Sequence, residues 1–218
     1  MNIALVRLKI RDVLPVEAIR KIVTKECGEP LIKLTHQTIY YIGEDEQAAY
    51  ARSAVIEKLM LVNRNLSVQG LSLCLFEAYR HPDKQRKMWE TEMERAKRFY
   101  PNKTTCELES IVSLRVADNN TIMSGHQTGG AVDVTICNKD GCILNMGTKY
   151  LEFNKQTNTK AKFHDSAITE NRRILLSAMK TAGFVNFPTE WWHYSYGDAM
   201  WAAYSWKKEA LYGPIYAW

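Results

Sequence analysis

The stretch 124–133 constrains the fold of this chain most, because a glycine pair separates a histidine from an aspartate. His126 and Asp133 lie seven residues apart, a spacing that would place both side chains on one face of a helix. Gly129-Gly130 stands between them, however, and each glycine inside a helix costs about 1 kcal/mol relative to alanine. We therefore predict a loop that carries His126 and leads into a strand, residues 131–136, that carries Asp133. A hairpin with both side chains exposed is the alternative for this stretch alone.

The segment Glu190-Trp191-Trp192-His193 adds a second histidine and a carboxylate. A zinc site in a hydrolase uses three protein ligands and keeps a fourth position for water. His126, Asp133 and His193 supply such a set, and Glu190 is left free to act as a base. Positions i and i+3 point to opposite faces of a regular strand, so we predict a bulge or a strand-end irregularity that turns Glu190 and His193 toward one metal. Taken alone, the segment also fits a core strand with a buried histidine and a glutamate at the rim.

Together these segments resemble a known enzyme family. The pattern Ser-x-His-x-x-Gly-x-Ala-x-Asp of residues 124–133, followed by Glu-x-Trp-His at 190–193, is similar to that of the zinc D-alanyl-D-alanine dipeptidases of the vancomycin-resistance type. The segment Glu-Ala-Tyr-Arg-His-Pro at 77–82 resembles the family's Asp-x-Tyr-Arg-Pro. Shorter matches follow in the family's order at 145–148, 170–173 and 183–184. The resemblance covers about residues 50–196.

The resemblance implies an α+β fold in which helices flank a central antiparallel sheet, as in the zinc D,D-peptidases and the related hedgehog signalling domain. A chain of this length suits one domain, so we expect residues 1–218 to form it. The implied cofactor is a zinc ion, and the implied substrate is a small D-Ala-D-Ala-like peptide. Zinc would lower the pKa of the attacking water. Glu190 would accept its proton and pass it to the leaving amine.

Three further residues acquire roles from the resemblance. The Arg80 guanidinium would stabilise the negative charge that develops on the scissile carbonyl oxygen, whereas an arginine after a strand is otherwise a surface residue. Ser124 would hydrogen-bond the C-terminal carboxylate of the substrate, or else serve only in a turn. The family holds the free amino group of the dipeptide with an acidic residue directly after an aromatic one. Here Leu151 follows Tyr150 and Glu152 comes one position later, so either Glu152 serves after a backbone shift, the amine is held otherwise, or the substrate is not a free dipeptide.

Two other functions remain open. The same metal chemistry would serve a D,D- or L,D-carboxypeptidase or an endopeptidase that acts on peptidoglycan peptides. A non-catalytic zinc-binding module, as in hedgehog-like domains, would bind a partner through the same cleft. The presence of Glu190 argues against a non-catalytic module, because a site without catalysis does not need a general base.

Composition narrows the range of partners. The chain is 46% apolar and 24% charged, which is typical of a soluble globular protein. Its net charge of +5 is dispersed among acidic residues, which argues against a nucleic-acid partner. No run approaches the roughly 18 apolar residues needed to cross a bilayer, and charges interrupt residues 1–12 too often for a signal peptide. We therefore expect a cytoplasmic protein without a membrane partner; the sequence does not set its oligomeric state.

The five cysteines form no Cys-x-x-Cys pair and are odd in number, which is typical of reduced thiols. Cys137 and Cys142 flank a predicted turn, so a disulfide between them is geometrically conceivable.

Hydrophobic periodicity predicts the remaining elements. Strands are expected over 5–10, 31–42, 71–77 and 187–196, and helices over 15–24, 46–65, 83–99, 103–116 and 168–182. Gly183 should end the last helix.

Overall fold

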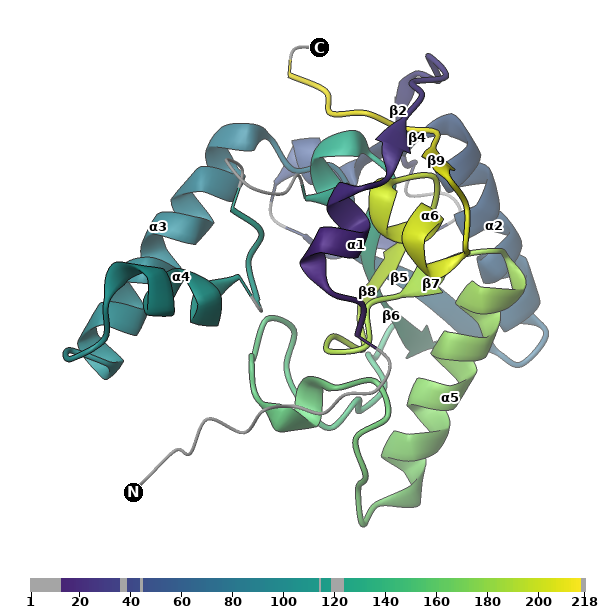
Figure 1. Ribbon diagram of the computed structural model, residues 1–218. Helices are drawn as coiled ribbons and strands as arrows, with labels where there is room; N and C mark the ends of the chain where they lie inside the picture. The colour runs from purple at the N-terminus through teal and green to yellow at the C-terminus, as the bar shows by residue number, and fades with distance from the viewer. Residues whose placement is uncertain (1–12, 36–38, 44, 114, 119–123, 217–218) are drawn as a thin grey trace.

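The computed structural model describes residues 13–35, 39–43, 45–113, 115–118 and 124–216, and a five-stranded sheet lies at its centre (Figure 1). The strand order is β3-β5-β6-β8-β7. The bounds are β3 Tyr40–Tyr41, β5 Leu71–Glu77, β6 Ala131–Asn138, β7 Val185–Asn186 and β8 His193–Ser195. Neighbouring strands are antiparallel except β3 and β5, which are parallel. The observed architecture is the predicted α+β arrangement.

Two helices, α2 (Ser53–Ser67) and α5 (Ser166–Thr181), pack side by side over one face of this sheet (Figure 1). In the main core, Val134 and Ile136 of β6 pack with apolar side chains of these two helices, and both residues are fully buried. Burial of an aliphatic side chain of this size stabilises the fold by about 1.5–3 kcal/mol. Successive strand residues point to opposite faces, so Asp133 and Thr135 face away from the helices. The sheet therefore has one apolar face and one face available for a polar site.

A bulge in β5 brings a second carboxylate to the polar face. Leu75 pairs with Val134 on the core side, and without an irregularity Glu77 would lie on that side as well. The register shifts between Leu75 and Glu77, and Glu77 pairs directly with Asp133. Because directly paired residues share a face, the bulge turns Glu77 toward the side that carries Asp133.

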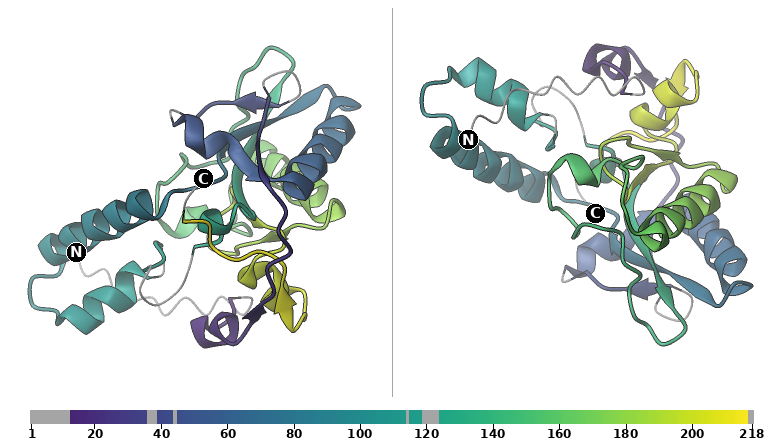
Figure 2. Two further views of the ribbon diagram at one scale, coloured as in Figure 1. Left: turned by 90° about the horizontal axis from the view of Figure 1, so that it is seen from above. Right: turned by 90° about the horizontal axis from the view of Figure 1, so that it is seen from below.

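An arm of two helices projects from the sheet (Figure 2). It consists of α3 (Pro82–Phe99) and α4 (Thr105–Val112), which pack on each other through a small apolar cluster of their own. Pro82 at the first position and the His81 side chain, which accepts from the Asp83 N–H, define the start of α3. Thr104 and Glu107 form a capping box at the start of α4.

Short elements complete the described chain. Two small sheets pair β1 (Val23–Thr24) with β9 (Glu209–Ala210) and β2 (Leu31–Lys33) with β4 (Tyr50–Arg52). The remaining helices are α1 (Val16–Arg20), α6 (Ala199–Tyr204) and the 3₁₀ helices η1 (Glu46–Ala49), η2 (Gly125–Thr128) and η3 (Lys155–Thr157). Among the described residues, no helix is both long and apolar enough to cross a membrane.

Several predicted boundaries are wrong where tertiary pairing overrides local periodicity. The predicted helix 46–65 begins only at Ser53, because residues 50–52 pair with β2. The predicted strand 31–42 contains two short strands, and the predicted helices 15–24 and 103–116 are shorter than expected. The predicted strand 71–77 is confirmed, and α5 ends before Gly183, which has a φ of 90°. The predicted strand 5–10 lies outside the described residues.

The thiols are free, as the scattered spacing and odd number of the cysteines indicated. Cys137 and Cys142 form no disulfide. The sulfur nearest to that of Cys137 belongs instead to Cys74 on the neighbouring strand, with an Sγ–Sγ distance of 2.8 Å.

Candidate active site

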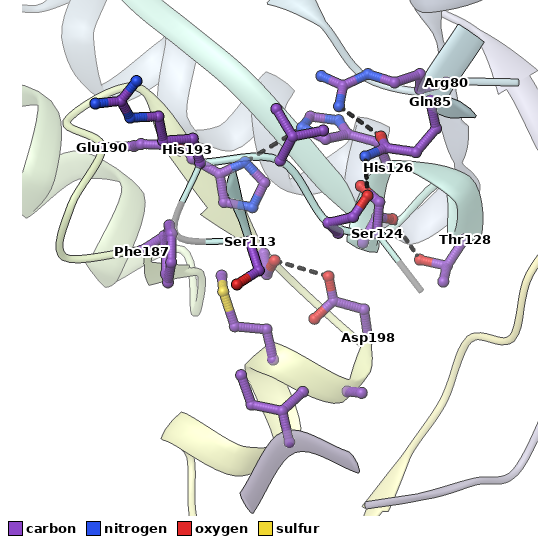
Figure 3. A pocket seen from close by; sticks show the side chains of 18 of the residues that line it. Arg80, Gln85, Ser113, Ser124, His126, Thr128, Phe187, Glu190, His193 and Asp198 are labelled. Carbon is purple, nitrogen blue, oxygen red and sulfur yellow. Dashed lines mark hydrogen bonds between the residues drawn. The ribbon is translucent and has the colours of Figure 1, made fainter. Parts of the chain in front are cut away.

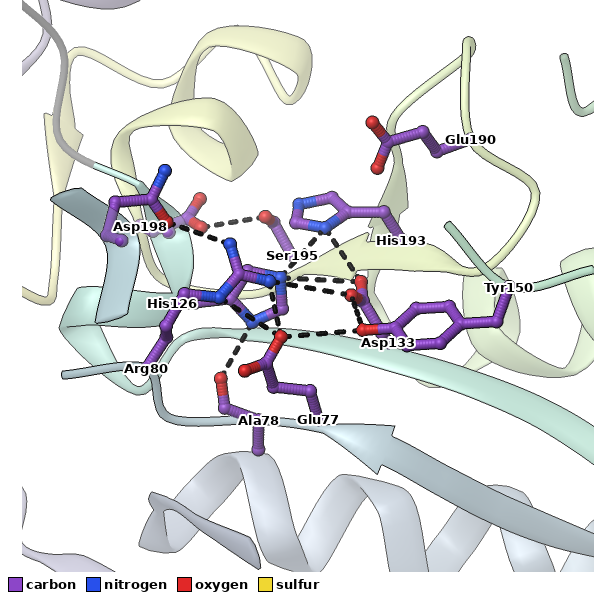
Figure 4. Close-up of polar contacts among 12 residues, drawn as sticks. Glu77, Ala78, Arg80, His126, Asp133, Tyr150, Glu190, His193, Ser195 and Asp198 are labelled. Carbon is purple, nitrogen blue, oxygen red and sulfur yellow. Dashed lines mark hydrogen bonds and ion pairs between the residues drawn. The ribbon is translucent and has the colours of Figure 1, made fainter. Parts of the chain in front are cut away.

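The three predicted metal ligands meet on the polar face of the sheet (Figure 4). His126 comes from η2, Asp133 from β6 and His193 from the start of β8. Asp133 and His193 are directly paired across the two strands. Each residue offers one donor atom, and these atoms lie within 4.8 Å of one another. His126 and Asp133 are buried, which excludes the exposed hairpin as the structure of this stretch.

The glycine pair shapes the loop that delivers His126. Gly129 ends η2 with a φ of 69°, a left-handed conformation that glycine adopts without steric cost. A Cβ on Gly130 would lie 2.6 Å from the Tyr196 carbonyl oxygen, so no larger residue fits there. The chain can therefore turn sharply between His126 and the strand that carries Asp133, as the sequence predicted.

Hydrogen bonding fixes which nitrogen of His126 faces the cluster. Its Nδ1 lies 2.7 Å from the Ala78 carbonyl oxygen, which can only accept, so Nδ1 carries the proton. In the neutral imidazole, Nε2 therefore presents a lone pair, 3.2 Å from His193 Nδ1 and 3.4 Å from Asp133 Oδ1. His193 Nδ1 is also 2.9 Å from Asp133 Oδ1. Two imidazole nitrogens and a carboxylate oxygen that converge in this way fit a three-ligand zinc site.

The electrostatics of Asp133 agree with a cation at this point. Burial would raise the pKa of its carboxyl group, but charge and hydrogen-bond interactions with His126 and His193 hold that pKa well below its usual range. Asp133 is therefore an anion at neutral pH, in the state that ligates a metal.

Arg80 lies just beyond β5 and is buried beside the cluster, not on the surface. Its Nε donates to Glu77 Oε2 at 3.0 Å and its Nη2 donates to the same oxygen, while Nη1 donates to Gln85 Oε1 at 2.8 Å. Nη2 is 3.9 Å from Asp133 Oδ2. Although burial would lower the pKa of Arg80, the Glu77 charge raises it, so the guanidinium stays charged.

Glu190 lies in a turn that precedes β8, where the His193 N–H donates to the Glu190 carbonyl oxygen at 3.3 Å. The turn is the predicted strand-end irregularity, and it replaces most of the predicted strand 187–196. Burial raises the pKa of the Glu190 carboxyl group to about 7. A carboxyl group with this pKa can both accept and release a proton at neutral pH.

A cavity of about 530 Å³ opens next to these groups (Figure 3). The ligand residues, Arg80, Glu190 and Ser124 all line it. Ser124 caps η2 through the capping box that it forms with Gln127. A cavity of this volume is in the range of small-ligand sites.

Glu152 is not in this cavity. Its carboxylate accepts from the Lys149 N–H at 2.9 Å and from Asn154 Nδ2 at 3.1 Å, and it lines a different pocket. Leu151 lines the cavity instead, with a φ of 59° that is unusual for a residue with a side chain. No backbone shift brings Glu152 to the metal ligands.

Sequence reasoning missed the part that Tyr150 plays in the site. Its hydroxyl donates to Asp133 Oδ2 at 2.8 Å and lies 3.4 Å from Glu77 Oε2. Only the fold reveals this contact, because Tyr150 and Asp133 lie on separate segments and the sequence does not show that they meet.

Comparison with known proteins assigns the chain to a family. A model of the peptidase family described as D-ala-D-ala dipeptidase matches residues 38–209. The chain belongs to the D-ala-D-ala dipeptidase family. It is thus a member of a metallopeptidase family, as the sequence motifs predicted. Zinc is the cofactor that this membership and the donor set indicate.

Curated relatives support membership in the D-ala-D-ala dipeptidase family. A D-alanyl-D-alanine dipeptidase of Escherichia coli is 27% identical over 159 residues, which cover 72% of this chain and 67% of the relative. A D-alanyl-D-alanine dipeptidase of Enterococcus faecalis is 32% identical over 102 residues, 46% of this chain and 48% of the relative. The match therefore spans about half the length of the second relative.

Solved structures confirm the fold. A vancomycin-resistance D,D-pentapeptidase in complex with Zn(II) aligns with a TM-score of 0.50 at 18% identity, over 85% of this chain and 88% of the other. VanYB in complex with D-alanine-D-alanine aligns with a TM-score of 0.52 at 16% identity, over 86% and 90%. These likenesses show that the chain has the predicted D,D-peptidase-like α+β fold.

Proposed function

We propose that this chain is a zinc-dependent dipeptidase that hydrolyses D-Ala-D-Ala or a similar short peptide. The observation that carries the proposal is the His126, Asp133 and His193 cluster beside a cavity that also contains Glu190. Family membership supports the peptidase class, and the D-alanine-D-alanine found with VanYB is a ligand of the proposed kind.

Each residue of the site has a separate role in the proposed reaction. His126, Asp133 and His193 would hold the zinc ion, which would supply Lewis acidity to the attacking water and to the scissile carbonyl. Glu190 accepts the proton of the attacking water and returns it to the leaving amine, a task to which its raised pKa is suited. Arg80, held in place by Glu77 and Gln85, presents a fixed positive charge to the oxygen on which negative charge develops. Ser124 lines the cavity where it can donate to the substrate carboxylate.

One observation favours a second candidate, a carboxypeptidase that acts on a longer peptide. The apolar Leu151 lines the cavity and Glu152 does not. Burying an ammonium group against apolar side chains without a partner is costly, so the wall near Leu151 suits a substrate whose amine is already acylated.

A cytoplasmic location and a substrate limited to small peptides, with no nucleic-acid or membrane partner, are also parts of the proposal. Cell fractionation would test the location, and binding assays would test the partners.

The test is hydrolysis of a peptide panel by metal-stripped protein with and without added Zn²⁺. The panel pairs free L,L-, L,D- and D,D-dipeptides with their N-acylated forms. We expect cleavage of D,D substrates only with zinc. Preference for the free form supports the dipeptidase, whereas preference for the acylated form supports the carboxypeptidase.

The matched control for the panel is Glu190→Gln, which keeps the size of the side chain. It should bind zinc as the wild type does and lose turnover by roughly 10²–10⁴-fold. Hydrolysis that resists chelation would contradict the zinc mechanism, and near-normal turnover of Glu190→Gln would contradict the general base.

A further inference from the structure

Two buried carboxylates face each other across β5 and β6. Glu77 is paired directly with Asp133, and the two residues are 4% and 1% exposed. Like charges at directly opposed positions destabilise a sheet, and burial strengthens the repulsion. The pair therefore needs positive charge or hydrogen-bond donors between its members.

Three side chains supply those donors, two of them for Glu77 and one for Asp133, and Figure 4 shows Arg80 and Tyr150 among them. Arg80 gives two hydrogen bonds to Glu77 and approaches Asp133 only to 3.9 Å. Lys84 pairs with the other oxygen of Glu77 at 2.8 Å. Tyr150 donates to Asp133 Oδ2 at 2.8 Å, and its contact with Glu77 is longer, at 3.4 Å. Since a hydroxyl has a single proton, Asp133 is its acceptor.

The two oxygens of Asp133 thus have different partners. Oδ1 lies 2.9 Å from His193 Nδ1 and 3.4 Å from His126 Nε2, so it faces the metal cluster. Oδ2 points away from the cluster toward Tyr150. The hydroxyl of Tyr150 is therefore placed to hold the rotation of the carboxylate, with Oδ1 on the side of the two imidazoles.

The Tyr150 ring is itself held firmly. It stacks on Phe76, with ring centroids 4.3 Å apart and planes 1° from parallel, and meets Trp192 edge-on at 5.6 Å. The backbone on both sides of it is tied to α5 by Arg172, whose Nε donates to the Met146 carbonyl at 2.7 Å and whose Nη2 donates to that of Gln156 at 2.8 Å. Such support is what a positioning group requires.

We propose that Tyr150 is a positioning residue for the metal: its hydroxyl holds Asp133 so that Oδ1 converges with the two imidazoles. The inference rests on the metal site of the proposed function, but it concerns the strength of metal binding and not the identity of the substrate. The Tyr150 hydroxyl takes no part in the chemical step.

The test is the zinc affinity of Tyr150→Phe, measured by competition with a chromophoric chelator. The substitution removes the hydroxyl and keeps the ring that stacks on Phe76. Loss of a hydrogen bond to a metal ligand typically weakens metal binding 10–100-fold, and we expect a loss in that range. The matched control is Tyr194→Phe, because the buried hydroxyl of Tyr194 has no hydrogen-bond partner among the described residues. Its zinc affinity should equal that of the wild type.

The melting temperature of the metal-free proteins separates positioning from a structural role. Metal-free Tyr150→Phe should melt within a few degrees of the wild type. Wild-type zinc affinity of Tyr150→Phe would overturn the inference and leave the proposed function intact. Failure of metal-free Tyr150→Phe to fold would have the same two consequences, because Tyr150 would then have a structural role. Failure of the wild type itself to bind zinc would instead overturn the proposed function.

Discussion

At the scale of single residues, the environment of Glu190 bears most directly on the proposed chemistry. The side chain is almost fully buried at the edge of the cavity, and burial raises its pKa to about 7. Asp133, which is more deeply buried, has its pKa shifted in the opposite direction because two histidines surround it. The same fold therefore keeps Asp133 charged, as the proposed zinc ligand must be, and leaves Glu190 able to exchange a proton, as the proposed base must. The difference between the pKa values of these two carboxyl groups follows from their surroundings and not from their residue types.

The raised pKa of Glu190 predicts a pH-dependent stability of the metal-free protein. A carboxyl group whose pKa is higher in the folded state than the ordinary value of 4.5 binds its proton more tightly when folded. Its contribution to the free energy of unfolding is complete below about pH 4.5 and is lost as the pH rises through about 7. The loss is on the order of 3 kcal/mol, since each unit of pKa shift corresponds to about 1.4 kcal/mol.

Denaturant titrations between pH 5 and 8 measure this effect as the difference between the wild type and Glu190→Gln. The difference cancels the titration of the histidines that both proteins share. The advantage of the wild type should shrink as the pH rises, and a difference that stays constant with pH would refute the raised pKa. Glu109→Gln, an exposed substitution on α4, is the control and should change nothing.

At the scale of elements, the placement of η2 depends on a buried arginine far from it in sequence. The Arg52 Nε donates to the Thr128 carbonyl oxygen at 2.7 Å, and the Arg52 N–H donates to that of Gly129 at 3.0 Å. The other guanidinium nitrogens bind the Glu26 carboxylate and the Glu29 and Gly213 carbonyl oxygens. Arg52 thus joins the loop that carries His126 to two distant segments of the chain.

Replacing this arginine should weaken both the fold and the metal site. Arg52→Met leaves the Thr128 carbonyl oxygen and the Glu26 carboxylate without their donor. We expect a loss of about 3 kcal/mol in the free energy of unfolding, the low end for breaking a buried ion pair, because the Glu26 side chain is 44% exposed. Zinc affinity should fall as well, since η2 loses an anchor.

Arg173→Met provides the comparison, because Arg173 pairs with Glu170 on the surface and should contribute less than about 1 kcal/mol. Equal denaturation midpoints for the two variants would show that Arg52 does not anchor η2.

At the scale of the whole molecule, the residues that form the His126, Asp133 and His193 cluster could be predicted from the sequence, whereas the contacts that hold them in place could not. Metal coordination allows few side chains, so the spacing of His126, Asp133 and His193 was informative without any knowledge of the fold. The bulge that turns Glu77, the contact of Tyr150 with Asp133 and the clamp around Arg52 all join segments far apart in sequence. Local periodicity contains no information about such pairings, which is also why the helix expected over 46–65 begins only at Ser53.

The central claim is that His126, Asp133 and His193 bind one zinc ion beside Glu190. Anomalous X-ray scattering at the zinc absorption edge, from crystals of metal-stripped protein soaked in Zn²⁺, tests this claim most directly. We predict one strong peak per chain, surrounded by His126 Nε2, Asp133 Oδ1 and His193 Nδ1, with the Glu190 carboxylate facing the same cavity. A cluster that stays empty while zinc binds elsewhere or not at all would contradict it.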